Sequence, residues 1–124
     1  MQTCLILDES SVIRKVAGRI LFQLGFTVSN AASSQEAIEL IAASGMPDVL
    51  IVAGCIGDGS CVDFIREVRG LENGSTPVIL ALLVEANLGQ MTRLKRAGAT
   101  GFIYKPFDRQ ALSDWLQPYV KNAA

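Results

Sequence analysis

Residues 77–84 read PVILALLV, the longest apolar run in the chain. A short run without polar interruption is typical of a strand buried on both faces, because a strand with one face in solvent alternates apolar and polar residues. The run is far shorter than the roughly 18 residues expected of a membrane-spanning segment. This segment therefore predicts a central strand of a parallel sheet.

Four further strands are predicted on either side of this run, at residues 4–7 (CLIL), 26–31 (FTVSNA), 49–53 (VLIVA) and 101–104 (GFIY). Segments with helical periodicity or helix-capping residues lie between and after them. Alternating strands and helices predict a parallel sheet covered on both faces. We therefore expect residues 1–124 to form a single domain with a doubly wound, flavodoxin-like α/β fold, (βα)5, around five parallel strands.

The first helix is delimited by residues that favour helix ends. Ser10 or Ser11 is the expected N-cap. Gly25 follows the last turn, at a position where a residue in the left-handed conformation is favoured. The buried stripe of this helix is predicted from a four-residue spacing of apolar residues. Its members are Val12, Val16, Ile20 and Leu24, whereas Arg14, Lys15 and Arg19 are expected to face away.

Composition excludes several classes of function. The net charge is -1 and the cations form no stripe, which argues against nucleic-acid binding. The N-terminus does not read as a signal peptide and no apolar stretch is long enough for a membrane span, so we expect a cytoplasmic protein without membrane contact. Histidine is absent, and Cys4, Cys55 and Cys61 show no metal-site spacing, which predicts free thiols.

Acidic and basic residues should meet at one edge of the predicted sheet. In an open doubly wound sheet, the functional crevice lies beyond the carboxyl ends of the strands. Asp8 and Glu9 follow the first strand, and Lys105 follows the fifth. Two acids and a lysine at such an edge suit a divalent cation and a phosphate, or they form a solvated ion pair with no further role.

Several stretches resemble the receiver domain family of bacterial response regulators, particularly the chemotaxis regulators. LILDESSVIRK (5–15) is similar to the stretch with the family's acidic pair, and PDVLIV (47–52) to the approach to its phosphoacceptor. PVILAL (77–82) is similar to the family's fourth strand, and AGATGFIYKPF (97–107) to its fifth strand with a Lys-Pro turn. The resemblance covers essentially the whole chain. It implies a part in two-component phosphorelay signalling.

The resemblance also implies roles for individual positions. The family's acidic pair corresponds to Asp8 and Glu9, its phosphate-contacting lysine to Lys105, and its switch aromatic to Phe102. The turn at Lys105-Pro106 resembles one that contains a cis peptide bond, so Pro106 is the candidate cis-proline.

Two positions depart from the family pattern. The phosphoacceptor aspartate corresponds to Ala53, and the fourth-strand Thr or Ser to Leu83, or to Leu82 if one counts from Pro77. Alanine offers neither a nucleophile nor a metal ligand, so we expect no aspartyl phosphorylation, no catalytic residue, no cofactor, and weak or lost Mg²⁺ binding. Asp58, in the loop GCIGDG, is interpreted as a solvated turn residue rather than a substitute acceptor, and the loop as a turn rather than a phosphate cradle.

Three functions remain open. The leading hypothesis is a non-enzymatic, stand-alone pseudo-receiver that contacts a histidine kinase, a phosphatase or a downstream target. Its expected partner face comprises exposed positions in residues 87–97, 102–104 and 108–120, with contributions from Trp115 and Tyr119. The first alternative is an ordinary phosphorylatable receiver carrying an engineered Asp→Ala substitution at position 53, and the second is a small-molecule or nucleotide binder on the same fold.

Overall fold

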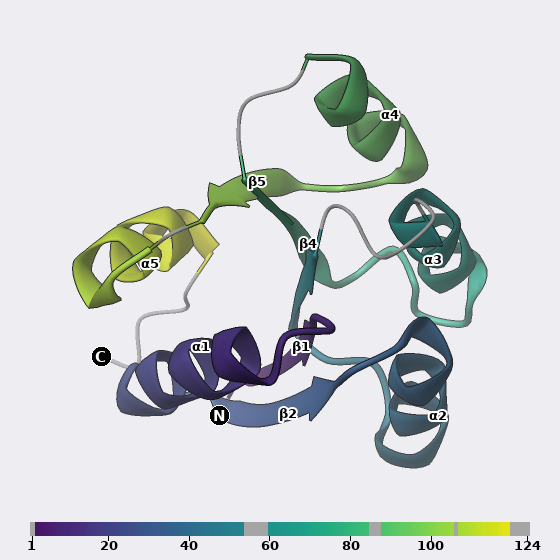
Figure 1. Ribbon diagram of the computed structural model, residues 1–124. Helices are drawn as coiled ribbons and strands as arrows, with labels where there is room; N and C mark the ends of the chain where they lie inside the picture. Colours follow the sequence, from purple (N-terminus) through teal and green to yellow (C-terminus); the bar gives the residue numbers. More distant parts are fainter. Residues whose placement is uncertain (1, 54–59, 85–87, 106, 120–124) are drawn as a thin grey trace.

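The computed structural model describes residues 2–53, 60–84, 88–105 and 107–119 (Figure 1). The elements follow one another as β1 (Thr3–Leu7), α1 (Ser11–Gln23), β2 (Thr27–Ala31), α2 (Ser34–Ser44), β3 (Val49–Ala53), α3 (Ser60–Gly70), β4 (Val78–Leu83), α4 (Leu88–Ala97), β5 (Gly101–Tyr104), α5 (Arg109–Leu116) and a 3-10 turn at Gln117–Tyr119. All strand pairs are parallel, in the order β2-β1-β3-β4-β5. The predicted doubly wound fold is confirmed. Cys55, Asp58 and the Lys105-Pro106 peptide lie outside the described residues.

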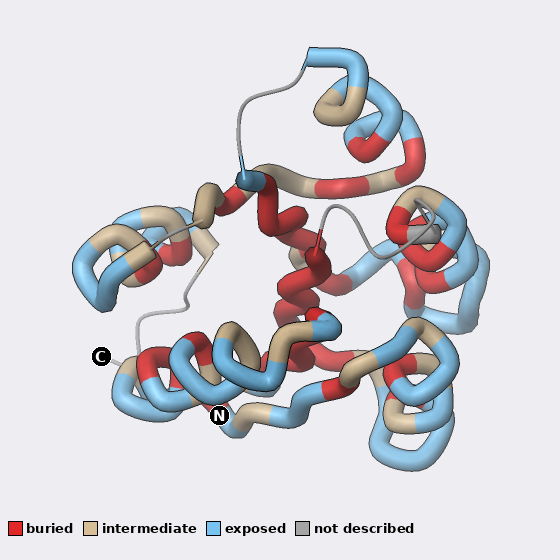
Figure 2. Tube along the Cα trace, in the orientation of Figure 1, coloured by how far each residue is buried: buried red, intermediate tan, exposed pale blue. Residues whose placement is uncertain are grey.

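The sheet is covered by helices on both faces, with α1 and α5 on one side and α2, α3 and α4 on the other (Figure 1). Figure 2 shows the buried residues concentrated in the central strands and on the helix faces turned toward them. Every residue of β3 is buried, as a continuous apolar strand requires. One apolar cluster fills the space beneath α2, α3 and α4, and a second fills the space beneath α1 and α5.

Helix α1 begins and ends as predicted, but its buried stripe differs from the prediction. The N-cap is Ser10, whose hydroxyl accepts a hydrogen bond from the Ile13 amide, and Gly25 has a φ of 98°. Val12 and Val16, however, are 66% and 44% exposed. Each four-residue step turns about 40° beyond a full turn, so a stripe defined by that spacing winds around the helix and leaves the sheet. The buried residues are Ala17, Ile20 and Leu21.

Arg69, near the end of α3, joins two loops at the amino edge of the sheet. Its guanidinium donates to the Gly74 and Pro77 carbonyls at 3.0 and 2.9 Å, and to the Gly98 carbonyl at 2.7 and 3.0 Å. A further bond of 3.3 Å reaches the Thr100 hydroxyl. Gly98 has a φ of 123°, and a Cβ there would lie 2.7 Å from Arg69 Cγ. The Arg69 side chain therefore fixes the carboxyl end of α4, and only glycine fits beneath it.

We predict that three glycine-to-alanine substitutions will differ in their effect on the free energy of unfolding. Gly98→Ala should lower the free energy of unfolding by about 1–3 kcal/mol or more, because it combines a strained φ with a clash against Arg69. Gly45 also has a positive φ, of 90°, but open space around it. Gly45→Ala should therefore cost only the backbone strain, about 1 kcal/mol. Urea denaturation of each variant measures these differences.

Gly70→Ala is the matched control, because Gly70 ends α3 with no atom near the added Cβ and no positive φ. It should leave stability unchanged or raise it by about 0.4–1 kcal/mol. Equal losses in Gly98→Ala and Gly45→Ala would show that the Arg69 side chain does not restrict position 98.

Candidate functional site

The fold brings the predicted site residues to one edge of the sheet. Asp8 directly follows β1, and Ala53 and Leu83 are the last residues of β3 and β4. Lys105 directly follows β5. Because β1, β3, β4 and β5 are successive neighbours and all parallel, their carboxyl ends lie side by side. These four positions therefore lie at the same edge of the sheet, where the sequence places them.

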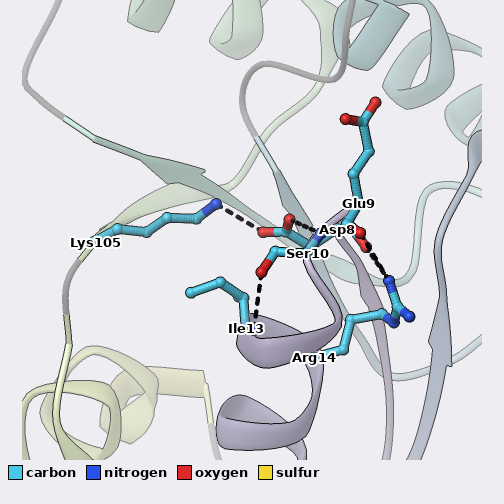
Figure 3. Close-up of polar contacts among 6 residues, drawn as sticks. All are labelled: Asp8, Glu9, Ser10, Ile13, Arg14 and Lys105. Atoms are coloured by element: carbon cyan, nitrogen blue, oxygen red, sulfur yellow. Dashed lines mark hydrogen bonds and ion pairs between the residues drawn. The ribbon is translucent and has the colours of Figure 1, made fainter.

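The central contact at this edge is an ion pair between Asp8 and Lys105 (Figure 3). Lys105 Nζ donates to Asp8 Oδ2 at 2.7 Å, and the two side chains are 22% and 5% exposed. The other carboxylate oxygen, Oδ1, accepts a hydrogen bond from the Ser10 amide at 2.9 Å. The Lys105 amide donates to the Leu83 carbonyl at 2.7 Å, which fixes the lysine backbone at the end of β4. Both oxygens of Asp8 are thus engaged within the protein.

Arg14 fixes the backbone of the acidic turn. Its Nη1 donates to the carbonyl oxygens of Asp8 and Glu9 at 2.7 and 3.2 Å. The prediction that Arg14 simply faces away from the core missed this role, because the hydrogen bonds depend on how the turn between β1 and α1 folds back over the helix. Two consecutive carbonyls held by one guanidinium orient the peptide units on which both acids sit.

Glu9 does not join the ion pair. Its carboxylate points away from Asp8 and Lys105 (Figure 3), and the residue is exposed. Among the described residues, Asp8 is therefore the acid of the predicted pair that meets Lys105. The site therefore consists of the neutralised Asp8–Lys105 ion pair and the separate, exposed carboxylate of Glu9.

The strands β3 and β4 end at this edge in apolar residues. Ala53 and Leu83 are 3% and 2% exposed and belong to the cluster beneath α2, α3 and α4. Phe102 is half-buried against the same cluster, and Ala81 is its partner in the β4–β5 register. Leu82 points to the opposite face of the sheet, into the cluster beneath α1 and α5. Leu83 therefore belongs to the same apolar cluster as Ala53 and Phe102, whereas the β3–β4 register pairs Ala53 with Leu82. The choice of Leu83 as the equivalent of the family's hydroxyl residue stays a prediction.

The face formed by α4, β5 and α5 carries aromatic and cationic residues. The rings of Tyr104 and Trp115 meet edge to face with centroids 6.0 Å apart, and both residues are half-buried. Helix α4 contains three cations and no acid in its sequence LGQMTRLKRA. Those cations, Arg93, Lys95 and Arg96, are all exposed. Leu88, at the start of α4, is 82% exposed.

The described residues contain neither a metal-binding cluster nor a membrane-spanning helix. No group of three or more His, Cys, Asp or Glu residues among them is placed to hold a metal ion. None of the described helices combines the length and apolar character needed to cross a membrane. The cytoplasmic location expected from the sequence stays a prediction.

The chain is similar in sequence and fold to known chemotaxis proteins and receiver domains. The chain is 28% identical over 113 residues to the chemotaxis protein CheY of Pseudomonas aeruginosa, with 91% of each chain covered. Its fold matches the crystal structure of Vibrio cholerae chemotaxis protein CheY4 with a TM-score of 0.90 and 28% identity, covering 97% of this chain and 99% of that one. The receiver domain of the sensor histidine kinase PA1611 from P. aeruginosa, solved with a magnesium ion in its active-site cleft, matches with a TM-score of 0.81 and 27% identity, covering 95% and 96% of the two chains.

The family of this chain is identified by its match to a family model. The response regulator receiver domain model matches residues 4–117, which contain Asp8, Ala53, Leu83 and Lys105. The match extends over nearly the whole described fold, from β1 to the end of α5. The chain belongs to the response regulator receiver domain family of two-component signalling.

Proposed function

We propose that this receiver domain is a pseudo-receiver, which signals by contact with other proteins and accepts no phosphoryl group. The observation that carries the proposal is Ala53, a buried methyl group at the position that corresponds to the family's phosphoacceptor. Receiver domains in general are signalling modules rather than enzymes, and they act on kinases and downstream targets.

The chemistry of phosphoryl transfer requires groups that this edge does not offer. A carboxylate must attack the phosphorus, and a metal ion and a cation must balance the charge that develops on the phosphoryl oxygens. Ala53 supplies no nucleophile. Asp8 is a poor substitute, because its two oxygens are held by the Ser10 amide and by Lys105. Lys105 in turn is paired with Asp8 and would have to give up this ion pair to contact a phosphate.

The donors at this edge also fit magnesium poorly. Mg²⁺ requires a near-octahedral set of oxygen ligands and is usually held by more than one anionic group. The P. aeruginosa PA1611 receiver domain holds magnesium in its active-site cleft. Here Ala53 provides no oxygen, Asp8 is paired with Lys105, and Glu9 points elsewhere. We propose that magnesium binding at this edge is weak or lost.

The proposed partner face is that of α4, β5 and α5. The Tyr104 and Trp115 rings offer apolar contact area with polar edges, which is common at protein interfaces. The exposed cations of α4 favour an acidic surface on the partner. The partner is proposed to be a histidine kinase, a phosphatase or a downstream target.

An ordinary receiver silenced only at position 53 is the less favoured alternative. Such a protein would keep the family's hydroxyl residue at the end of the fourth strand. Leu83 is buried there instead, so the chain departs from the family pattern at two positions that face the same cluster. No specific observation favours a small-molecule or nucleotide binder.

We predict that the protein will not be phosphorylated by a small phosphodonor. After incubation with acetyl phosphate and magnesium, intact-mass spectrometry should show no added phosphoryl group, because Ala53 lacks a nucleophile. Beryllofluoride with magnesium should leave the amide NMR spectrum unchanged. A stoichiometric mass gain of one phosphoryl group would contradict the proposal, and peptide mapping would then locate the acceptor.

We expect Ala53→Asp to restore magnesium binding. The new carboxylate would lie beside Asp8 and compete for Lys105, so the metal-free variant should lose stability. Magnesium should raise its melting temperature, because a cation that binds only the folded state stabilises it. Its affinity for magnesium should exceed that of the parent by about tenfold or more, equivalent to ~1.4 kcal/mol. Calorimetric titration and thermal melts measure both effects.

Ala53→Asn is the matched control for this substitution, since it has the same shape without the charge, and it should bind magnesium no better than the parent. Adding Leu83→Thr to Ala53→Asp should enlarge the response of the Phe102 ring to beryllofluoride, because threonine supplies the missing hydroxyl. If Ala53→Asp and Ala53→Asn behave alike, position 53 does not border the crevice with Asp8.

The partner face can be tested by charge reversal. Arg93→Glu combined with Arg96→Glu should reduce capture of signalling proteins from a bacterial lysate by about tenfold or more, because an acidic partner would then be repelled. Arg19→Glu with Arg66→Glu, an equal change of charge on α1 and α3, is the control. Quantitative mass spectrometry measures the capture. A loss in the control alone would place the partner surface elsewhere.

A further inference from the structure

The strand β2 forms an open edge of the sheet. The strand order ends at β2, and no strand lies beyond it in the described parts of the chain. The Thr27 amide donates to the Gln2 carbonyl at 2.9 Å, and the Ala31 carbonyl accepts from the Asp8 amide at 3.2 Å. Hydrogen bonding alternates along a parallel strand, so the backbone groups of Val28 and Asn30 face the open edge.

This edge lacks the features that usually block the pairing of a further strand. Exposed edge strands are commonly protected by charged residues, proline or a bulge. The β2 sequence is TVSNA, which contains neither a charge nor proline, and its register with β1 runs without interruption from Thr27 to Ala31. At five residues, β2 has the length of an ordinary strand. A segment of another protein could therefore align with it along its full length.

A groove runs between this edge and α1. It has a volume of about 610 Å³, and its lining includes residues of both elements. Phe22, in the last turn of α1, is 74% exposed. An aromatic side chain this exposed beside the open edge of a strand provides an apolar contact for a bound segment. Val28 lines the groove from the strand side.

The charges of the groove indicate which kind of segment it would accept. Its lining contains Arg14 and Lys15 and no acid. Arg14 also holds the carbonyls of the acidic turn, whereas Lys15 is exposed. A second copy of this chain would bring the same cations face to face, which disfavours self-association through this edge. Two cations are also too few to form the clustered stripe that nucleic-acid binding requires.

We propose that the groove between α1 and β2 binds an extended, acidic segment of another protein, which adds to the sheet as a sixth strand beside β2. Backbone hydrogen bonds to Val28 and Asn30 would hold the segment in register. An apolar side chain would pack on Phe22, and a carboxylate would lie near Lys15. This surface is separate from the α4–β5–α5 face, so either proposal can fail without the other.

A pair of synthetic peptides tests this proposal. One is Glu-Val-Glu-Phe-Glu-Val-Glu, and its control replaces each Glu by Lys. In amide NMR titrations the acidic peptide should shift the Val28 and Asn30 signals saturably and slow the exchange of those amides. It should bind at least about tenfold more tightly than the basic peptide. Phe22→Ala and Lys15→Glu should each weaken binding of the acidic peptide severalfold, whereas Leu88→Ala, a similarly exposed residue on α4, should not.

Asn30→Pro removes the amide that faces the open edge without removing a bond to β1, so it should abolish binding while circular dichroism stays unchanged. If this variant does not fold, Phe22→Ala and Lys15→Glu decide the question. Equal affinity for the two peptides would overturn the proposal. So would shifts confined to Val12 and Val16 on α1, or dimerisation of the protein alone through β2 in sedimentation experiments.

Discussion

The ion pair between Asp8 and Lys105 is the interaction on which the functional edge depends. It joins residues 97 positions apart, one after β1 and the other after β5, across the carboxyl ends of β3 and β4. Charges in so shielded a place interact more strongly than on an open surface, and either one alone would be costly to bury. With Ala53 beneath them, each has the other as its nearest counter-charge. The two shielded charges of this edge therefore neutralise each other.

Much of the fold and part of this edge can be predicted from the sequence. Continuous apolar runs gave the strands, and β3 occurs at the predicted residues, because a strand buried on both faces leaves an unbroken signal. Asp8 and Lys105 were found from their positions after strands. The contacts of Arg14 were not, because they depend on how a turn folds back over α1. The exposure of Val12 and Val16 was also missed, since a four-residue spacing does not follow one face of a helix for three turns.

The apolar clusters on the two faces of the sheet distinguish two residues that counting along the sequence does not. Leu82 and Leu83 are equally apolar and adjacent, and the chain alone does not say which one shares a face with Ala53. Alternation along β4 places them in different clusters, and Leu83 lies on the side of Phe102. The strand ends at this edge are apolar while the backbone is that of a receiver domain, and a fold does not by itself fix a function.

The most direct test of this account is the NMR signal of the Lys105 ammonium group, followed through a titration with magnesium and then with acetyl phosphate. A lysine held by Asp8 at 2.7 Å should show an ammonium signal protected from exchange with water. Because Ala53 offers no acceptor, this signal should keep its position and its protection throughout the titration. The signal should be missing from the spectrum of a Lys105→Met variant, which confirms its assignment. A shift or loss of the signal on addition of magnesium or the phosphodonor would show that the edge still responds to phosphoryl chemistry and would contradict the proposed pseudo-receiver.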